Sequence, residues 1–140
     1  MASTPRACDD GGVFFPGTSK CYQLYKELLP WRDARMECQR RGGDLASIAD
    51  QDTQEFVEDN FKFSSWPTQD GGRHDGAWLG GQLRSGNWTW ADGTPWSGFD
   101  LNTQHDGQEY LFIKRKYKWA DCSNTCNGGL QYLCQFESNL

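Results

Sequence analysis

The spacing of hydrophobic positions predicts a helix early in the chain. Residues at i, i+3, i+4 and i+7 lie on one face of a helix, and these positions are held here by Trp31, Ala34, Arg35 and Cys38. Pro30 suits the start of the helix because its ring presets a helical φ, and the pair Gly42-Gly43 suits its end. Cys38 is therefore expected on the same face as Trp31.

A second helix is predicted a few residues later. Asp52 and Glu55 have the spacing of a capping box, in which two side chains bond the backbone at a helix start. This helix is expected to run through about Asn60. Its acidic side chains have no basic neighbour in the segment, so we expect one face to be exposed to solvent.

Short runs of β-type residues surround these helices. Two short strands are predicted around the turn between Cys8 and Cys21, one at 45–48, and others at 77–79, 87–90, 110–113 and 130–135. The stretch 93–108 has neither helical nor strand periodicity, which predicts a long irregular loop, and such loops are usually functional or disordered. The sequence predicts an α+β fold in a single domain, 1–140, with a compact part of about 8–136.

Composition narrows the class of partner. Fourteen Lys and Arg side chains against 19 Asp and Glu give a net charge of −5, which argues against nucleic acid and anionic membrane surfaces as partners. Seven Trp, five Tyr and eight Phe predict a core rich in aromatic rings. No apolar run is long enough for a membrane span or for the core of a signal peptide, so we expect no membrane insertion and recognise no signal peptide.

The cysteines indicate an oxidising compartment. There are six, at positions 8, 21, 38, 122, 126 and 134, and their spacing fits no zinc pattern. Only His74 and His105 are available as imidazole ligands, so zinc is not expected. Three disulfides and a secreted or extracellular location are the better account, although six cysteines leave fifteen pairings open.

Four segments together resemble the C-type lectin-like domain. The first joins the early helix to the strand behind it, and runs from Trp31 to Ile48. The others are similar to the family's WIGL, WxWxDGxP and WND motifs, and read Trp78-Leu79-Gly80-Gly81, Trp88-Thr89-Trp90-Ala91-Asp92-Gly93-Thr94-Pro95 and Trp119-Ala120-Asp121. They occur in the family's order between the outer cysteines, so the resemblance covers nearly the whole chain.

The resemblance implies a disulfide framework. It pairs Cys38 with Cys134, from the helix to the last strand, and Cys8 with Cys21 in the N-terminal hairpin of the family's long form. The family's remaining bridge would join the positions that hold Tyr110 and Asn124 here. Cys122 and Cys126 are then left to pair with each other, and two free thiols are the alternative.

The resemblance also implies a calcium site. In members that bind sugar, a Glu-Pro-Asn or Gln-Pro-Asp tripeptide, a later Glu and the Asn-Asp of WND supply oxygens to the ion, which takes roughly 6 to 8 of them. Counted back from Trp119, these positions hold Asp100-Leu101-Asn102, Gln108 with Glu109 beside it, and Ala120-Asp121. The candidate metal ligands are Asp100, Asn102, Glu109 and Asp121. The candidate ligand-binding residues are these four with Gln108 and, from its place in the loop, Trp96.

Two substitutions within this site leave calcium binding open. Ala120 lacks the oxygen that would touch both metal and sugar. Leu101 replaces a proline whose cis bond turns both flanking side chains to the ion, and a cis bond before leucine costs about 2.5–4 kcal/mol. The alternative interpretation is that Asp100, Asn102, Asp106 and Glu109 are turn residues of a polar loop.

The tryptophans divide into two predicted groups. Trp78, Trp88, Trp90 and Trp119 occupy the family's packing motifs and are expected in the core. Trp96 and Phe99 lie within the predicted loop and are expected to form an exposed contact surface, because aromatic anchors dominate interface energetics.

These observations lead to two hypotheses on function. The first is a secreted recognition module that binds a glycan or glycoprotein with a divalent metal, through the loop 96–109 and the edge 118–121. The alternative is a calcium-independent domain that recognises a protein or another non-sugar ligand. The sequence contains no nucleophile elbow, metalloprotease motif or phosphate-binding glycine loop, so we do not expect an enzyme.

Overall fold

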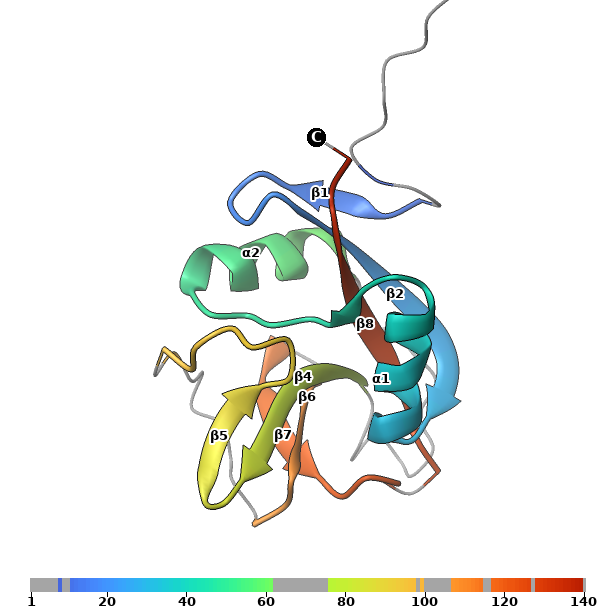
Figure 1. Ribbon diagram of the computed structural model, residues 1–140, viewed down its shortest axis with the longest axis vertical. Coiled ribbons are helices and arrows are strands. Elements are labelled where there is room, and N and C mark those ends of the chain that lie inside the picture. The colour runs from blue at the N-terminus through green and yellow to red at the C-terminus, as the bar shows by residue number, and fades with distance from the viewer. Residues whose placement is uncertain are drawn as a thin grey trace, which may run out of the picture.

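The computed structural model describes residues 8, 11–61, 76–97, 99, 107–114, 117–126 and 128–139. These residues form two helices, α1 (Trp31–Arg40) and α2 (Gln51–Asn60), and a set of strands (Figure 1). The strands are β1 (Val13–Phe15), β2 (Lys20–Leu29), β3 (Asp44–Leu45), β4 (Gly76–Arg84), β5 (Asn87–Trp90), β6 (Tyr110–Lys114), β7 (Trp119–Cys122) and β8 (Leu130–Glu137). The predicted α+β class is confirmed.

All of these strands belong to one sheet. Its order is β1-β2-β8-β4-β6-β7, with β3 added to β8 and β5 added to β4. The last strand, β8, therefore lies between β2 and β4, and Figure 1 shows it running beside β2 through the middle of the molecule. The β4 and β8 pair is parallel, and the other strand pairs of this sheet are antiparallel. The parallel pair arises because β8 is inserted between two strands that are distant in sequence.

Helix α1 begins at Trp31, as predicted, but its cap comes from elsewhere in the chain. Pro30 offers no side-chain hydrogen bond. The backbone N–H of Trp31 donates instead to the carbonyl oxygen of Asn124 at 2.9 Å, and the N–H of Arg32 donates to Asn124 Oδ1 at 2.9 Å. Tyr110 stacks on Trp31 with ring centroids 4.3 Å apart. The two positions of the family's remaining bridge thus hold non-covalent contacts to one helix end.

Helix α2 begins earlier than the capping-box spacing predicts. Its N-cap is Asp50, whose extended backbone lets the side chain accept a hydrogen bond from the N–H of Thr53 at 2.9 Å. Asp52 lies inside the first turn, where a carboxylate stabilises the helix through the macrodipole and does not cap it. The predicted end at Asn60 is confirmed.

The core consists of two hydrophobic clusters. One is built around Ile48, Leu111 and Trp119, and the other around Trp31, Trp78 and Tyr132. Trp78, Trp90 and Trp119 are buried as predicted, and Trp88 is half-buried against the first cluster. Aliphatic side chains share the core with the aromatic rings, among them Leu45, Ile48, Leu79, Leu111, Ile113 and Leu133.

All six cysteines are paired. The bridges join Cys8 to Cys21, Cys38 to Cys134, and Cys122 to Cys126. The framework implied by the family resemblance is confirmed, and so is the small third loop. Cys38 on α1 is thereby linked to β8 in the middle of the sheet, which fixes the first helix to the last strand.

Gln131 has a buried side chain that lacks hydrogen-bond partners. It lies on β8 opposite Ala77, is 1% exposed, and neither its Oε1 nor its Nε2 has a partner in the described part of the chain. An unsatisfied buried polar group costs about 1–3 kcal/mol. We expect Gln131→Met, which keeps the length of the side chain, to raise the free energy of unfolding by about 1–3 kcal/mol in guanidinium titrations.

Gln54 provides the matched control for this substitution. It is also fully buried, but its Nε2 donates to the Tyr117 carbonyl oxygen at 3.0 Å and its Oε1 accepts from Trp119 Nε1 at 3.1 Å. Gln54→Met should therefore lower stability by a similar amount, because it removes both of these hydrogen bonds. Destabilisation by both substitutions would show that the Gln131 amide is satisfied in solution.

Candidate functional site

The predicted loop begins at a hydrogen-bonded turn formed by Asp92. Asp92 Oδ1 accepts from the backbone N–H of Thr94 at 2.9 Å, and Oδ2 accepts from the hydroxyls of Thr94 at 2.9 Å and Ser47 at 3.0 Å. The Gln135 amide also donates to Oδ2, and Lys20 Nζ lies 3.8 Å away. The entry of the loop is thus tied to β8 and to the segment after β3.

The hydrogen bonds to Asp92 outweigh its burial. Burial alone would raise the pKa of this carboxyl, because it disfavours the charged form. The hydrogen bonds from Thr94, Gln135 and Ser47 favour the carboxylate and leave the pKa below its ordinary value. Asp92 is therefore held as an anion that anchors the loop.

Trp96 and Phe99, two residues of the predicted loop, pack their rings against the core. Trp96 is half-buried and stacks on Trp90 with centroids 4.9 Å apart, and its centroid lies 6.4 Å from that of Trp119. Phe99 meets the edge of Trp119 at 5.6 Å. Both rings pack against the first core cluster, so they present less surface to solvent than the sequence predicted. The ligand-binding role of Trp96 stays a prediction.

The loop ends beside a buried carboxylate. Asp121 lies on β7 opposite Leu111 of β6, is 5% exposed, and accepts the backbone N–H of Gln108 at its Oδ2, 3.1 Å away. At the other end, Ser97 Oγ donates to the carbonyl oxygen of Ala49 at 2.6 Å. The predicted loop is therefore pinned at both ends to the strands and to the segment before α2.

The remaining predicted site residues lie in different surroundings. The side chains of Gln108 and Glu109 are exposed, and Glu109 lines a groove beside α1 together with Tyr110. Ala120 is 8% exposed and belongs to the second core cluster, opposite Phe112. Asp100 and Asn102, with the neighbouring Leu101 and His105, lie outside the described residues.

The described side chains meet a metal ion's requirements in part. Asp121 offers a carboxylate at the base of the loop, which is the donor chemistry that calcium prefers. Ala120 offers no oxygen. Within the described ranges, no group of three or more His, Cys, Asp and Glu side chains is placed to hold a metal ion. The other two predicted acidic and amide ligands from the loop, Asp100 and Asn102, lie outside the described residues.

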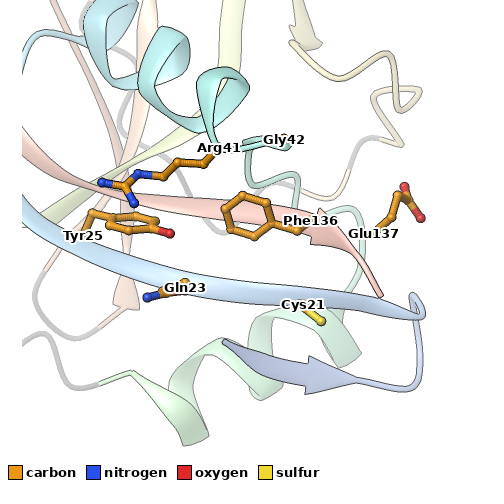
Figure 2. A pocket seen from close by; sticks show the side chains of 7 residues that line it. All are labelled: Cys21, Gln23, Tyr25, Arg41, Gly42, Phe136 and Glu137. Atoms are coloured by element: carbon orange, nitrogen blue, oxygen red, sulfur yellow. The ribbon is translucent and has the colours of Figure 1, made fainter. Parts of the chain in front are cut away.

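A hollow of about 320 Å³ lies over β2 and β8, away from the loop (Figure 2). Its aromatic side chains already have partners. The guanidinium of Arg41 lies 4.4 Å over the Tyr25 ring, and Tyr25 also stacks on Tyr132 with centroids 5.3 Å apart. The Phe136 ring fills the space left by the missing side chain of Gly43. These contacts give the hollow a structural role.

Sequence reasoning missed the groove beside α1. It is walled by Arg32, Arg35 and Met36 of the helix and by Arg84 at the end of β4, and it holds about 480 Å³. The signal was present on one face of the helix, where the spacing i, i+3, i+4 and i+7 is held by Arg32, Arg35, Met36 and Gln39. What the sequence did not show was the hairpin that faces them.

The chain was compared with known proteins. Residues 27–136 match the family described as Lectin C-type domain. The chain is 30% identical over 128 residues to the secretory phospholipase A2 receptor of Pongo abelii. This match covers 82% of the chain and 8% of the receptor. It is 33% identical over 90 residues to the lactose-binding lectin l-2 of Anguilla japonica. That match covers 63% of the chain and 48% of the lectin.

The fold has close counterparts among solved structures. A calcium-independent type II antifreeze protein superposes with a TM-score of 0.75 over 98% of this chain and 99% of that chain, at 20% identity, a level that shows the fold alone. In the described residues, no helix has the length and apolarity needed to cross a membrane. The chain spans less than half the length of the phospholipase receptor or the eel lectin. On the match to residues 27–136, the chain belongs to the C-type lectin domain family.

Proposed function

We propose that this chain is an extracellular recognition domain that binds a glycan with the help of a divalent cation at the long loop. The observation that carries the proposal is the Asp121 carboxylate, which is buried at the base of the loop and bonded to its last segment. Asp121 occupies the position at which sugar-binding relatives supply an aspartate to calcium. The lactose-binding relative from Anguilla japonica supports a sugar as the ligand.

The proposed metal ligands are Asp100, Asn102, Glu109 and Asp121, with calcium as the ion. A bound calcium would supply positive charge and open coordination positions to vicinal sugar hydroxyls. Trp96 and Gln108 are the proposed further contacts to the sugar. The Glu109 side chain is exposed and lines the groove beside α1.

The alternative is recognition of a protein or another non-sugar ligand without calcium. Ala120 favours this alternative, because its methyl group is packed in the core where sugar-binding relatives place an oxygen. The same loop surface would then act through its polar side chains and through Trp96. No catalytic role is proposed, since the matched family consists of recognition domains.

Calorimetry with calcium distinguishes the two functions. We expect saturable heat with wild type, and loss of that heat in Asp100→Ala and in Asp121→Asn, which keeps an acceptor for the Gln108 N–H. Glu55→Ala removes an exposed carboxylate from α2 and should bind calcium as wild type does. We further expect retention on immobilised lactose that EDTA abolishes. Absence of calcium heat together with a blank glycan array would reject the lectin and leave the calcium-independent function.

A further inference from the structure

The groove beside α1 combines arginine side chains with exposed apolar surface. We call it the arginine groove and define it by Arg32, Arg35, Met36, Leu83 and Arg84, with Glu109 on its rim. One wall is the outer face of α1, and the other is the end of β4 where the chain turns into β5. The groove does not include the described part of the long loop that precedes Gly107.

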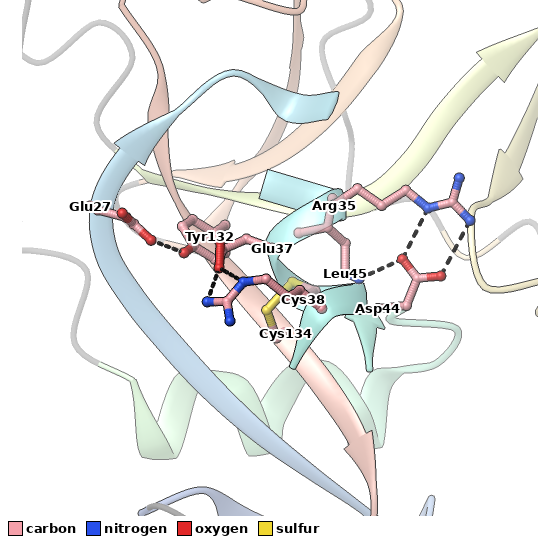
Figure 3. Close-up of a disulfide and its surroundings, with 9 residues drawn as sticks. Glu27, Arg35, Glu37, Cys38, Asp44, Leu45, Tyr132 and Cys134 are labelled. Atoms are coloured by element: carbon pink, nitrogen blue, oxygen red, sulfur yellow. Dashed lines mark hydrogen bonds and ion pairs between the residues drawn. A yellow bond between two sulfur atoms is a disulfide. The ribbon is translucent and has the colours of Figure 1, made fainter. Parts of the chain in front are cut away.

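Arg35 is the fixed member of the three arginines. Its guanidinium forms two bonds to the Asp44 carboxylate, at 3.1 and 3.3 Å (Figure 3). It forms a third bond to the carbonyl oxygen of Ala91 at 3.0 Å. Asp44 therefore compensates the charge of Arg35. The positive charge that the groove offers to a ligand therefore comes from Arg32 and Arg84.

Arg32 and Arg84 are held in place by neutral groups. The Nε of Arg32 donates to the Tyr110 hydroxyl at 3.2 Å, and the Nε of Arg84 donates to Gln82 Oε1 at 3.2 Å. Within the described ranges, neither guanidinium has a carboxylate within 4.0 Å. Both side chains are exposed. The groove thus carries two guanidinium groups that form no ion pair within the described ranges, with the Glu109 carboxylate on its rim acting electrostatically on Arg32, on a protein whose net charge is −5.

Apolar surface lies between these charges. Met36 is 64% exposed, and no other large hydrophobic side chain in the described part of the chain is classed as exposed. Leu83 lines the facing wall and is half-buried. Arginine, methionine and aromatic side chains are the types enriched in protein interfaces. Trp31 and Tyr110 also line the groove, but both are buried, so the apolar surface open to a ligand comes from Met36 and Leu83.

We propose that the arginine groove docks an acidic segment of a partner protein. A carboxylate of that segment pairs with Arg32 and Arg84, because the guanidinium fork matches carboxylate geometry in two-pronged bonds. An adjacent aliphatic or aromatic side chain covers Met36 and Leu83. The two arginines, already oriented by Tyr110 and Gln82, lose little rotamer freedom on binding.

The groove suits a mixed segment better than a uniform polyanion. A sulfated polysaccharide would bring repeated negative charge against Glu109 and against the acidic protein as a whole. It would also leave Met36 and Leu83 exposed to water. This inference does not rest on the proposed lectin activity, since the two arginines, Met36 and Leu83 lie outside the loop 96–109.

The test pans a phage-displayed library of random dodecapeptides on the wild-type protein in EDTA, which removes divalent cations from the loop. We expect enriched peptides to combine Asp or Glu with a neighbouring aliphatic or aromatic residue. A synthetic peptide of the consensus should bind the Arg32→Gln/Arg84→Gln variant at least about tenfold more weakly than wild type. Met36→Gln should weaken binding severalfold, and added salt should weaken binding to wild type.

The control variant removes the same number of charges elsewhere. Lys26→Gln/Arg40→Gln alters two exposed cations outside the groove and should bind the peptide within about twofold of wild type. If the double arginine variant does not fold, Arg84→Gln alone provides the comparison. Equal losses in both double variants, or no acidic consensus from the library, would overturn the proposal. Retention on heparin that depends on Arg32 and Arg84, without peptide enrichment, would identify a polyanion site instead.

Discussion

Replacing Cys38 and Cys134 together by alanine is expected to remove about 4–5 kcal/mol of stability. The bridge joins residues 96 positions apart, so its loss frees a long segment of the unfolded chain. Both cysteines are fully buried, beside Leu45 and Tyr132 (Figure 3), and alanine avoids placing a hydroxyl there. The melting temperature should fall by about 15 °C in calorimetry, with the other two bridges intact.

The short bridge provides the control for this prediction. Cys122 and Cys126 are 4 residues apart, and closing so small a loop restricts the unfolded chain by only about 2 kcal/mol. Cys122→Ala/Cys126→Ala should therefore lower the melting temperature by about half as much as the long-bridge variant. Equal losses in the two variants would mean that local packing, and not loop closure, is the source of the stability.

Asp92→Ala is expected to cost about 3 kcal/mol at neutral pH, the second largest effect. The carboxylate accepts bonds from Ser47, Thr94 and Gln135, and its removal leaves two of these partners, Ser47 and Gln135, buried with fewer bonds. Guanidinium titration measures the loss. Asp92→Asn should lie between wild type and alanine, because its amide retains one acceptor oxygen but turns a donor toward other donors.

The stability that Asp92 contributes also depends on pH. Its pKa is lower in the folded protein than the ordinary 3.8, so the unfolded chain takes up the proton first as pH falls. The contribution is complete above about pH 5 and is lost as pH falls through the folded pKa. Wild type and Asp92→Ala should therefore converge in stability as the pH falls below 3.8. A difference that stays constant down to pH 2 would contradict this assignment.

Local signals in the sequence identified most of the elements. The apolar spacing from Trp31 to Cys38 gave the first helix, because a helical face repeats over residues that are close in the chain. The strand at 87–90 was predicted with the same bounds as β5. Two misses have a local cause as well. The cap of α2 was assigned to Asp52, whereas the N-cap is Asp50. Strand β7 was not predicted, because four residues of one motif carry too little periodicity.

The candidate site was less accessible to sequence reasoning. The position of Asp121 at the base of the loop matches its motif, but its bond to Gln108 depends on how β6 and β7 pair. Burial of Trp96 against Trp90 depends on the path of the loop after Asp92. Asp100 and Asn102 lie outside the described residues, so their proposed role is for calorimetry to test.

The sequence by itself determined the fold class, the two helices, the family resemblance and, through that resemblance, the disulfide framework. These depend on motifs and on spacing along the chain. The tertiary structure alone decided that β8 enters the sheet between β2 and β4, that Asn124 caps α1, and that Arg84 faces Arg32 across a groove. Each of these contacts joins residues at least 50 positions apart, and no local periodicity specifies such a pairing because it is fixed only when the sheet closes.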